Sequence, residues 1–247
     1  MIRLDRQGDV AVVTLDRPAA KNAVDRATMK ALHALIDEIE SDASLGCAIL
    51  TAAGDTFIAG GDLRDLAALT TAAEGRAMSL AMQATLARWA ALPFPTIAAI
   101  NGDAFGGGCE IALACDLRVI ATGARMVWKQ VAMGLGPGWG GGQRLQRLVG
   151  PSRALRWLVT SAAVGAEEAL ASGLVDRVDD RALAAAHELA AVICSSSRAA
   201  VRAVKRALVV GRDLPLGAAI DFEAELFGQL WGQGDHRAAV SAFLTRR

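Results

Sequence analysis

The stretch that decides the fold is "GDAFGGGCEIALACD" (residues 102–116), where three consecutive glycines stand just before a lone glutamate in an otherwise apolar run. The preceding "TIAAIN" (96–101) has the branched apolar residues of a strand, and "CEIALAC" (109–115) has the composition of a helix. The glycines therefore fall where a strand turns into a helix. The first N–H groups of a helix have no intrahelical partner and carry the positive end of its dipole, so an anion can meet the backbone at this junction.

The chemistry of this junction depends on the spacing of Gly107 and Glu110. Residues three apart lie on one helix face, so the free amide of Gly107 and the carboxylate of Glu110 project to the same side. Such a pair would stabilise negative charge and move a proton in one pocket. A tight glycine turn followed by a glutamate that merely favours the helix dipole gives the same pattern, and this stretch alone leaves both interpretations open.

A second stretch, "AAGDTFIAGGDL" (52–63), repeats the arrangement. Gly60, Gly61 and Asp62 follow a strand-like run and come just before the helix-like "LRDLAAL". Two backbone donors from separate turns can hold one oxygen from two sides, which is how a developing oxyanion is stabilised. The two glycine turns together therefore predict an oxyanion site. Asp62 fits the N-cap of the following helix as well as a contact to substrate.

Outside these turns, short strand-like runs alternate with helical ones, which is typical of an α/β protein. Asn22 is the expected N-cap of the first helix. Beyond residue 178 the pattern is helical, so we divide the chain into a core (1–194) and a C-terminal helical region (195–247). The predicted strands cover 10–15, 47–51, 96–101, 116–121 and 173–178, and the predicted helices cover 22–40 and 71–92.

Composition restricts the functional classes. With 247 residues, 53% of them hydrophobic, the chain can bury the core of one large domain. Its 26 basic residues balance 26 acidic ones without a basic tract, which argues against nucleic-acid or anionic-membrane binding. No apolar run approaches the roughly 18 residues of a spanning helix, and the opening lacks a signal peptide's apolar stretch. Because its four cysteines and three histidines lack disulfide-scaffold or metal-site spacing, we expect a reduced, cytoplasmic protein without metal or separate cofactor.

Five blocks of sequence, in this order and over nearly the whole chain, resemble the signatures of the crotonase superfamily, also called the enoyl-CoA hydratase/isomerase family. The resemblance implies a spiral core of repeated β-β-α turns, a C-terminal helical trimerisation region, and a homotrimer or a hexamer of two trimers. It also implies an acyl-CoA thioester substrate, of which coenzyme A is a part, with its carbonyl oxygen between the amides of Gly61 and Gly107. The blocks are "FIAGGDL", "NGDAFGGGCEIALACD", "MGLGPGWGGGQRL", "SAAVGAEEALASGLVDRV" and "AFLTRR".

The resemblance also exposes a departure at Gln130. Hydratases of this family use two glutamates, and the first of them corresponds to Glu110. The second position, four residues before the glycine of "MGLG", holds Gln130. A carboxamide cannot accept and return a proton as a carboxylate does, so Glu110 is left as the only obvious acid/base group.

This departure favours decarboxylation of a short 2-carboxyacyl-CoA, of the methylmalonyl- or ethylmalonyl-CoA type, over hydration. Loss of CO2 gives the enolate directly, so such an acyl-CoA lyase needs an oxyanion hole and one proton donor. Several stretches also resemble the ethylmalonyl-CoA decarboxylase branch of the family, notably "MQATLARWAALPFP", the tryptophan of "GPGWGGG", "AVKRALVVGRDLPL" and "FGQLWGQG". Two alternatives stay open: an enoyl-CoA hydratase with Glu110 as its single catalytic glutamate, and a CoA-thioester-binding protein without turnover.

The predicted site combines these residues. The catalytic set is Glu110, Gly61, Gly107 and Gln130. Packing alone would also explain a tryptophan beside glycines. The residues predicted to contact the substrate are Ala59, Gly60, Asp62, Leu63, Trp128, Pro137 and Trp139.

One competing motif is rejected on context. Gly136, Gly138 and Gly141 match the dinucleotide-binding pattern G-x-G-x-x-G. No clear strand leads directly into the match, Pro137 removes a backbone donor, and no acidic residue follows about twenty positions on. We therefore do not expect a nicotinamide or flavin nucleotide here.

Overall fold

A six-stranded sheet forms the base of the structure, a computed structural model that describes residues 1–245. The spatial order is β1-β2-β3-β5-β7-β10; β1 runs antiparallel to β2, and the other neighbours are parallel. The strands are β1 (Ile2–Gln7), β2 (Val10–Leu15), β3 (Cys47–Ala52), β5 (Thr96–Ile100), β7 (Leu117–Ile120) and β10 (Arg177–Val178). Every residue of β2, β3 and β5 is buried, as expected for strands covered on both faces.

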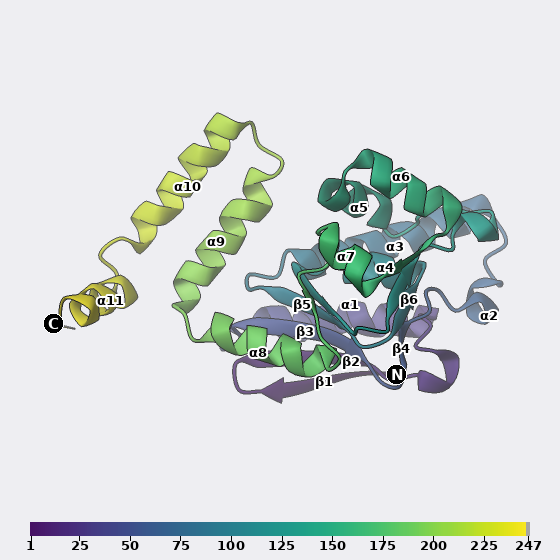
Figure 1. The fold of residues 1–247 in the computed structure, drawn as a ribbon, viewed down its shortest axis with the longest axis horizontal. Helices are drawn as coiled ribbons and strands as arrows, with labels where there is room; N and C mark the ends of the chain where they lie inside the picture. Colours follow the sequence, from purple (N-terminus) through teal and green to yellow (C-terminus); the bar gives the residue numbers. More distant parts are fainter. Residues whose placement is uncertain (246–247) are drawn as a thin grey trace.

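Alternate residues of these strands enter two hydrophobic cores. Val10 and Val12 of β2 face the smaller core, which is closed by the alanine-rich helix α8 (Ala182–Cys194). Ala11 and Val13 face the larger core on the other side of the sheet. Helices α1 (Arg26–Ser41) and α3 (Ala72–Ala90), both labelled in Figure 1, contribute buried apolar residues to that larger core.

A second, four-stranded sheet lies over the larger core. Its order is β4-β6-β8-β9, parallel except that β9 runs antiparallel to β8. Three times the chain passes from a strand of the first sheet to a strand of the second and then into a helical segment. The strand pairs are β3–β4, β5–β6 and β7–β8. This repeat is the predicted spiral of β-β-α turns. The strands are β4 (Thr56–Ile58), β6 (Asp103–Phe105), β8 (Arg125–Val127) and β9 (Ala163–Gly165).

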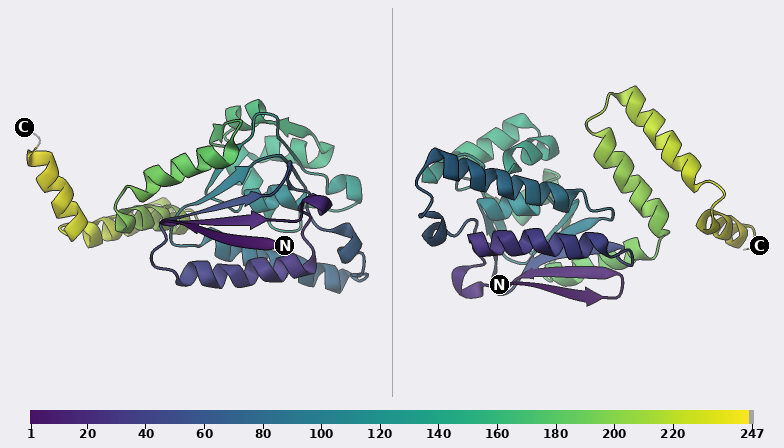
Figure 2. Two further views of the ribbon diagram at one scale, coloured as in Figure 1. Left: turned by 90° about the horizontal axis from the view of Figure 1, so that it is seen from below. Right: turned by 180° about the vertical axis from the view of Figure 1, so that it is seen from behind.

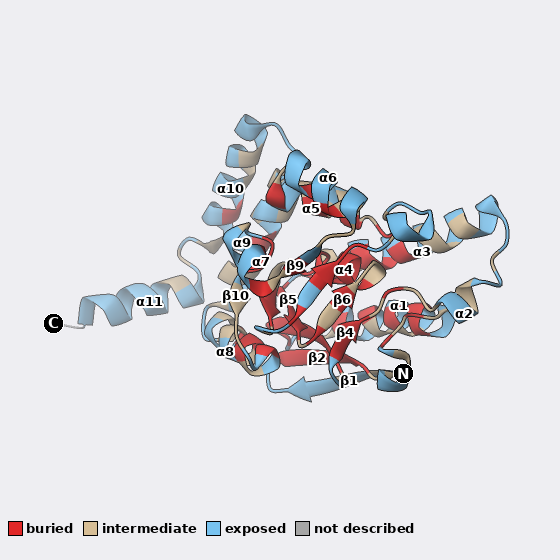
Figure 3. Cartoon of the chain, turned by 45° about the vertical axis from the view of Figure 1, so that its right-hand side comes forward, coloured by how far each residue is buried: buried red, intermediate tan, exposed pale blue. Residues whose placement is uncertain are grey.

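The remaining helices pack around this spiral or leave it. Short segments η1 (Pro18–Ala20), α2 (Leu63–Leu66), α4 (Gly107–Ala112) and η2 (Val131–Met133) lie in the connections. Helix α5 (Gly141–Val149) packs against α4 and α6 (Pro151–Thr160), and α7 (Ala166–Ala171) packs against β9 and β10. The last three, α9 (Arg198–Gly211), α10 (Leu216–Leu230) and α11 (Gly234–Thr245), extend from the body as an arm (Figure 2). Buried residues are concentrated in the spiral, while the arm is largely exposed (Figure 3).

The base of the arm is fixed to the body by a buried lysine. The ammonium of Lys205 in α9 donates to the carbonyl oxygen of Phe94 at 2.9 Å and to the carboxylate of Asp116 at 2.7 Å. The predicted boundary between residues 194 and 195 coincides with the C-terminus of α8. In residues 1–245 no helix has both the length and the hydrophobicity that crossing a membrane requires.

The prediction for Asn22 was wrong. Helix α1 begins at Arg26, and its N-cap is Asp25, whose carboxylate accepts from the Thr28 amide. Asn22 has a positive φ of 54°, and its amide donates to the carbonyl oxygens of Ala53 and Thr56 at 2.8 Å each. It therefore holds the turn between β3 and β4 instead of starting the helix.

The turn between β5 and β6 gives a test of the fold. A Cβ on Gly102 would overlap the backbone carbonyl of Asp55, which cannot move without shifting the neighbouring turn. Gly102→Ala is expected to lower the free energy of unfolding by about 3 kcal/mol. Gly123→Ala, where a Cβ meets nothing within 4 Å, is the control and should change it little. Urea unfolding of both variants measures the difference; equal midpoints would contradict the packing described here.

Candidate active site

The first glycine turn leaves the amide of Gly61 unpaired. Gly61 forms a parallel bridge with Val24, in which Val24 N–H donates to the Gly60 carbonyl at 2.8 Å and Asp62 N–H donates to the Val24 carbonyl at 2.9 Å. Because the flanking residues make these bonds, the N–H of Gly61 points away from Val24. It has no acceptor among residues 1–245.

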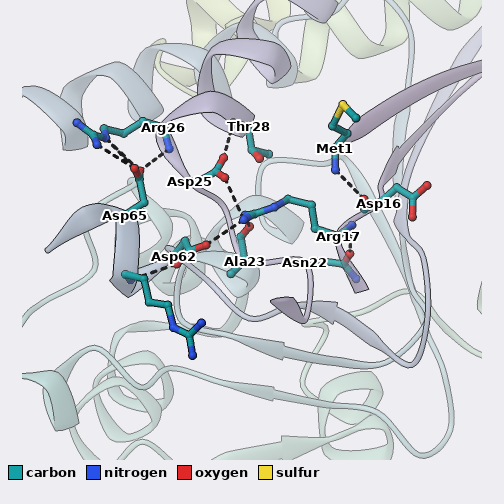
Figure 4. Close-up of polar contacts among 11 residues, drawn as sticks. Met1, Asp16, Arg17, Asn22, Ala23, Asp25, Arg26, Thr28, Asp62 and Asp65 are labelled. Atoms are coloured by element: carbon teal, nitrogen blue, oxygen red, sulfur yellow. Dashed lines mark hydrogen bonds and ion pairs between the residues drawn. The ribbon is translucent and has the colours of Figure 1, made fainter. Parts of the chain in front are cut away.

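An ionic network braces this turn from outside (Figure 4). The guanidinium of Arg17 lies 3.0 Å from the carboxylate of Asp25 and 3.1 Å from that of Asp62. Asp62 also accepts from the Arg64 amide at 3.1 Å as the N-cap of α2. The Asp62 carboxylate therefore has two intramolecular partners, which gives it a structural role. Leu63, next along, is 60% exposed.

The second glycine turn brings the amide of Gly107 beside the first. Gly106 has a φ of 50° and donates to the Val127 carbonyl, and Gly107 is the first residue of α4. The Gly107 amide makes no hydrogen bond to any residue that the structure describes. A Cβ placed on Gly60 would lie only 3.2 Å from the Gly107 nitrogen, so the two turns are in contact. Two unpaired amides thus lie on adjoining turns.

Glu110 is buried and surrounded by donors. Its side chain accepts four hydrogen bonds, and the residue is only 2% exposed. Oε2 accepts from the backbone N–H groups of Trp139 and Gly141, both at 2.7 Å. Oε1 accepts from the backbone N–H of Gly138 at 3.2 Å and from Nε2 of Gln130 at 3.0 Å. Since an ionised carboxylate only accepts, this set of donors suits the charged form.

The side chain of Gln130 is only half satisfied in its hydrogen bonding. Its Nε2 is directed to Glu110, while its Oε1 is buried without any hydrogen-bond partner in the described residues. Its side chain lies beside the second glycine turn, 3.8 Å from the position of a Cβ on Gly106. An unpartnered buried carbonyl is unusual, because burying such a group without a partner costs free energy.

Trp139 forms an apolar wall next to both free amides. A Cβ on Gly107 would overlap its indole, and one on Gly61 would lie 3.7 Å from indole Cζ2 and 2.6 Å from Leu66 Cδ1. The indole is 4% exposed, and its Nε1 donates to the Met78 sulfur at 3.4 Å. Any group bound between the two amides therefore lies close to this ring.

The other predicted residues have different surroundings. Trp128 is fully buried and stacks on Trp157, with ring centroids 5.9 Å apart, so it belongs to the core. Ala59 donates its amide to the Lys21 carbonyl, which fixes the chain just before Gly60. Pro137 packs against Gly142, on the loop that supplies the donors of Glu110.

Neither a reactive thiol nor a metal cluster is present beside Glu110. Burial raises the pKa of the Cys109 thiol well above its usual range, so this neighbour of Glu110 stays protonated. Within the described residues no three His, Cys, Asp or Glu side chains form a group that could hold a metal ion.

Comparison with known proteins gives a consistent result. The family model "Enoyl-CoA hydratase/isomerase" matches residues 5–247. The chain is 39% identical to the short-chain-enoyl-CoA hydratase of Clostridium acetobutylicum, over 99% of this chain and 94% of that protein. It is 35% identical to the crotonyl-CoA hydratase of Syntrophomonas wolfei, over 100% of this chain and 95% of that protein.

The solved structures agree with the sequence relatives. The crystal structure of an enoyl-CoA hydratase from Bacillus anthracis superposes with a TM-score of 0.94 at 32% identity, over 100% of this chain and 96% of that one. The relatives named here are hydratases, and none of them carries the name of the decarboxylase branch. The fold, the matched family model and these relatives show that the chain belongs to the enoyl-CoA hydratase/isomerase family.

Proposed function

We propose that the protein hydrates a short 2-enoyl-CoA thioester, with Glu110 as its single acid/base residue. The observation that carries this proposal is that Gln130 binds the Glu110 carboxylate through Nε2 while its own Oε1 is left without a partner among the described residues. The proposed reaction adds water across the C2=C3 bond and needs no group beyond the CoA of the substrate. The relatives are named as hydratases, which also favours hydration over decarboxylation.

Two neighbouring acceptors suit a water molecule better than a substrate carboxylate. Water has two hydrogens, and it can donate one to Gln130 Oε1 and the other to Glu110, leaving a lone pair for bond formation. An ionised carboxylate has no hydrogen to donate, so it cannot form hydrogen bonds to two acceptors. One of the two N–H groups of Gln130 Nε2 already donates to Glu110, so only the other could meet a departing carboxylate.

In the proposed reaction the thioester oxygen accepts from the amides of Gly61 and Gly107. Glu110 takes a proton from water as the water oxygen bonds to C3, and the electron pair of the double bond moves toward the thioester oxygen. The resulting enolate collapses as Glu110 returns the proton to C2, so one carboxylate closes the proton balance. One of its four donors has to yield to the water, and the contact from Gly138, at 3.2 Å, is the longest.

Trp139 supports an acyl group of few carbons. Its indole packs on Gly107 and lies beside Gly61. An acyl chain whose carbonyl oxygen is held by both amides therefore contacts this ring within a few carbons of its carbonyl group. The ring is fixed by burial and by its bond to Met78. The substrate class we propose is therefore the short-chain 2-enoyl-CoA thioesters.

Decarboxylation of methylmalonyl- or ethylmalonyl-CoA is a second candidate. The specific observation in its favour is the replacement of a second carboxylate by Gln130, together with the apolar indole beside the two amides. An enolate formed by loss of CO2 is stabilised by the same amides and requires only a proton. Both candidates use the oxyanion site, and they differ in what occupies the space beside Gln130.

We also propose that the arm mediates assembly into a homotrimer or a hexamer. Its helices expose large apolar side chains, which would be unusual on a free surface of this extent. They include Val204, Leu208, Leu216, Ile220, Phe227, Trp231 and Phe243. In a closed trimer the arm of each copy would pack on the next copy in a head-to-tail contact that the threefold rotation closes.

Hydration of crotonyl-CoA tests the main proposal. The wild-type protein should consume the enoyl thioester, and Glu110→Gln should lower kcat about a thousandfold because the proton carrier is lost. Gln130→Met should lower kcat roughly tenfold by removing one partner of the water, while Gln130→Glu, which supplies a second carboxylate, should retain or raise it. An unchanged kcat in Gln130→Met would contradict the water site.

The same proteins incubated with methylmalonyl- and ethylmalonyl-CoA distinguish the alternatives. Faster CO2 release from these thioesters than hydration of crotonyl-CoA would replace the main proposal by decarboxylation. A raised melting temperature with CoA thioesters but without either reaction would identify a binding protein.

Substitution of Trp139 tests the limit on acyl length. In the wild type, kcat/KM should fall steeply from four-carbon to eight-carbon enoyl-CoA. Trp139→Ala should raise kcat/KM for the longer substrate roughly tenfold relative to the shorter one, because apolar space opens beside the amides. Leu155→Ala, at an apolar residue that is 62% exposed on α6, is the control. A parallel change for both chain lengths would show that Trp139 does not set the length.

Light scattering after gel filtration tests the assembly. The expected mass is three or six times the 25.6 kDa of one chain. Leu208→Glu with Phe227→Glu should yield smaller species, because both side chains are exposed apolar groups of the arm. A wild-type mass equal to one chain would refute the proposal.

A further inference from the structure

Helix α3 contacts the loop that holds Glu110, although sequence analysis assigns it no functional residue. The hydroxyl of Ser79 donates to the carbonyl oxygen of Gly138, and Nε2 of Gln83 donates to the same oxygen at 3.0 Å. Gln83 also donates to the Ser79 hydroxyl at 3.1 Å. Two side chains of one helix therefore converge on a single backbone carbonyl.

That carbonyl belongs to the same peptide unit as one of the donors to Glu110. The C=O of Gly138 and the N–H of Trp139 are the two ends of one planar group, and in a trans peptide they point in opposite directions. On one side Ser79 and Gln83 hold the oxygen; on the other side the N–H of Trp139 donates to Glu110 Oε2 at 2.7 Å. A direct chain of hydrogen bonds thus runs from the surface of α3 to the buried carboxylate.

We propose that Ser79 and Gln83 are positioning residues that act on Glu110 through the Gly138–Trp139 peptide. They fix the plane of the peptide, and so the direction in which the Trp139 N–H points. Hydrogen bonds to a carbonyl also polarise its peptide group and strengthen the N–H as a donor. The catalytic part of this inference rests on the proposed function, whereas the hydrogen-bond chain itself does not.

Neither residue is needed to complete the core. Gln83 is exposed and Ser79 is half-buried, so water can replace either side chain at the Gly138 carbonyl without leaving it unsatisfied. Trp139 is buried and has a separate anchor, because its indole Nε1 donates to the Met78 sulfur. What the two side chains add is a fixed orientation of one peptide, which water does not impose.

Kinetics of matched variants test the catalytic effect. We expect Ser79→Ala and Gln83→Met each to lower kcat for enoyl-CoA hydration several-fold, and the double variant to lower it roughly tenfold. KM should change less than twofold, because neither residue borders the amides of Gly61 and Gly107. Ser79→Thr, which keeps the hydroxyl, should restore kcat. Gln143→Met on α5 is the control, since among residues 1–245 the carboxamide of this exposed residue hydrogen-bonds only to Gln146.

A spectroscopic readout tests the hydrogen-bond chain independently of any reaction. In protein labelled with 15N-tryptophan, five backbone amide signals are expected, and Trp139→Phe identifies that of Trp139. In the Ser79→Ala, Gln83→Met double variant this signal should move upfield and exchange faster with solvent, while the other four stay in place.

The two readouts separate the possible failures. An unmoved Trp139 amide signal, or an unchanged kcat in a folded double variant, would overturn the inference; so would a loss confined to KM. If the signal moves as expected and the wild-type protein does not hydrate enoyl-CoA, the hydrogen-bond chain stands and the proposed function fails.

Discussion

The buried carboxylate of Glu110 is the constraint on which the rest of the site depends. A carboxylate removed from water is costly unless donors surround it. This chain supplies three backbone amides from the loop 138–141 and the carboxamide of Gln130. The requirement ties α4, which carries Glu110, to the start of α5, and it explains the glycine at 141, where a Cβ would overlap the glutamate side chain. The loop is therefore shaped by the charge it encloses.

Sequence could predict the parts of the fold that leave a local mark. Glycine turns at 60–61 and 106–108, and the buried strands β2, β3 and β5, were predicted from residue type and pattern. The family resemblance implied β-β-α turns, but the strands of the second sheet were not located, because β4, β6, β8 and β9 have three residues each, too few to display an alternation. Asn22 was assigned wrongly because its partners, Ala53 and Thr56, are more than thirty residues away.

The candidate site shows the same division. Glu110, Gly61 and Gly107 were recognisable in sequence, because glycines mark the turns that expose these two amides. The backbone donors to Glu110 from Gly138, Trp139 and Gly141 were not, because their contact depends on how that loop folds back onto α4. Gln130 was interpreted as a lost acid/base group, and the structure adds that it binds Glu110 and retains a buried acceptor. Ser79 and Gln83 lie on an ordinary amphipathic helix, and only the path of the 138–141 loop brings them to the Gly138 carbonyl.

Trp139 links the shape of the pocket to its proton chemistry. Its indole packs against the Gly107 turn, while its own backbone N–H holds Glu110. In the proposed reaction an acyl group that pushes on the ring also pulls on the peptide that orients the carboxylate. Helix α3 resists movement of the ring, because the indole donates to Met78. It also resists movement of the peptide, because Ser79 and Gln83 donate to the Gly138 carbonyl. Discrimination by acyl size then acts on the rate of the chemical step as well as on binding, because a poorly fitting acyl group displaces the base that it needs.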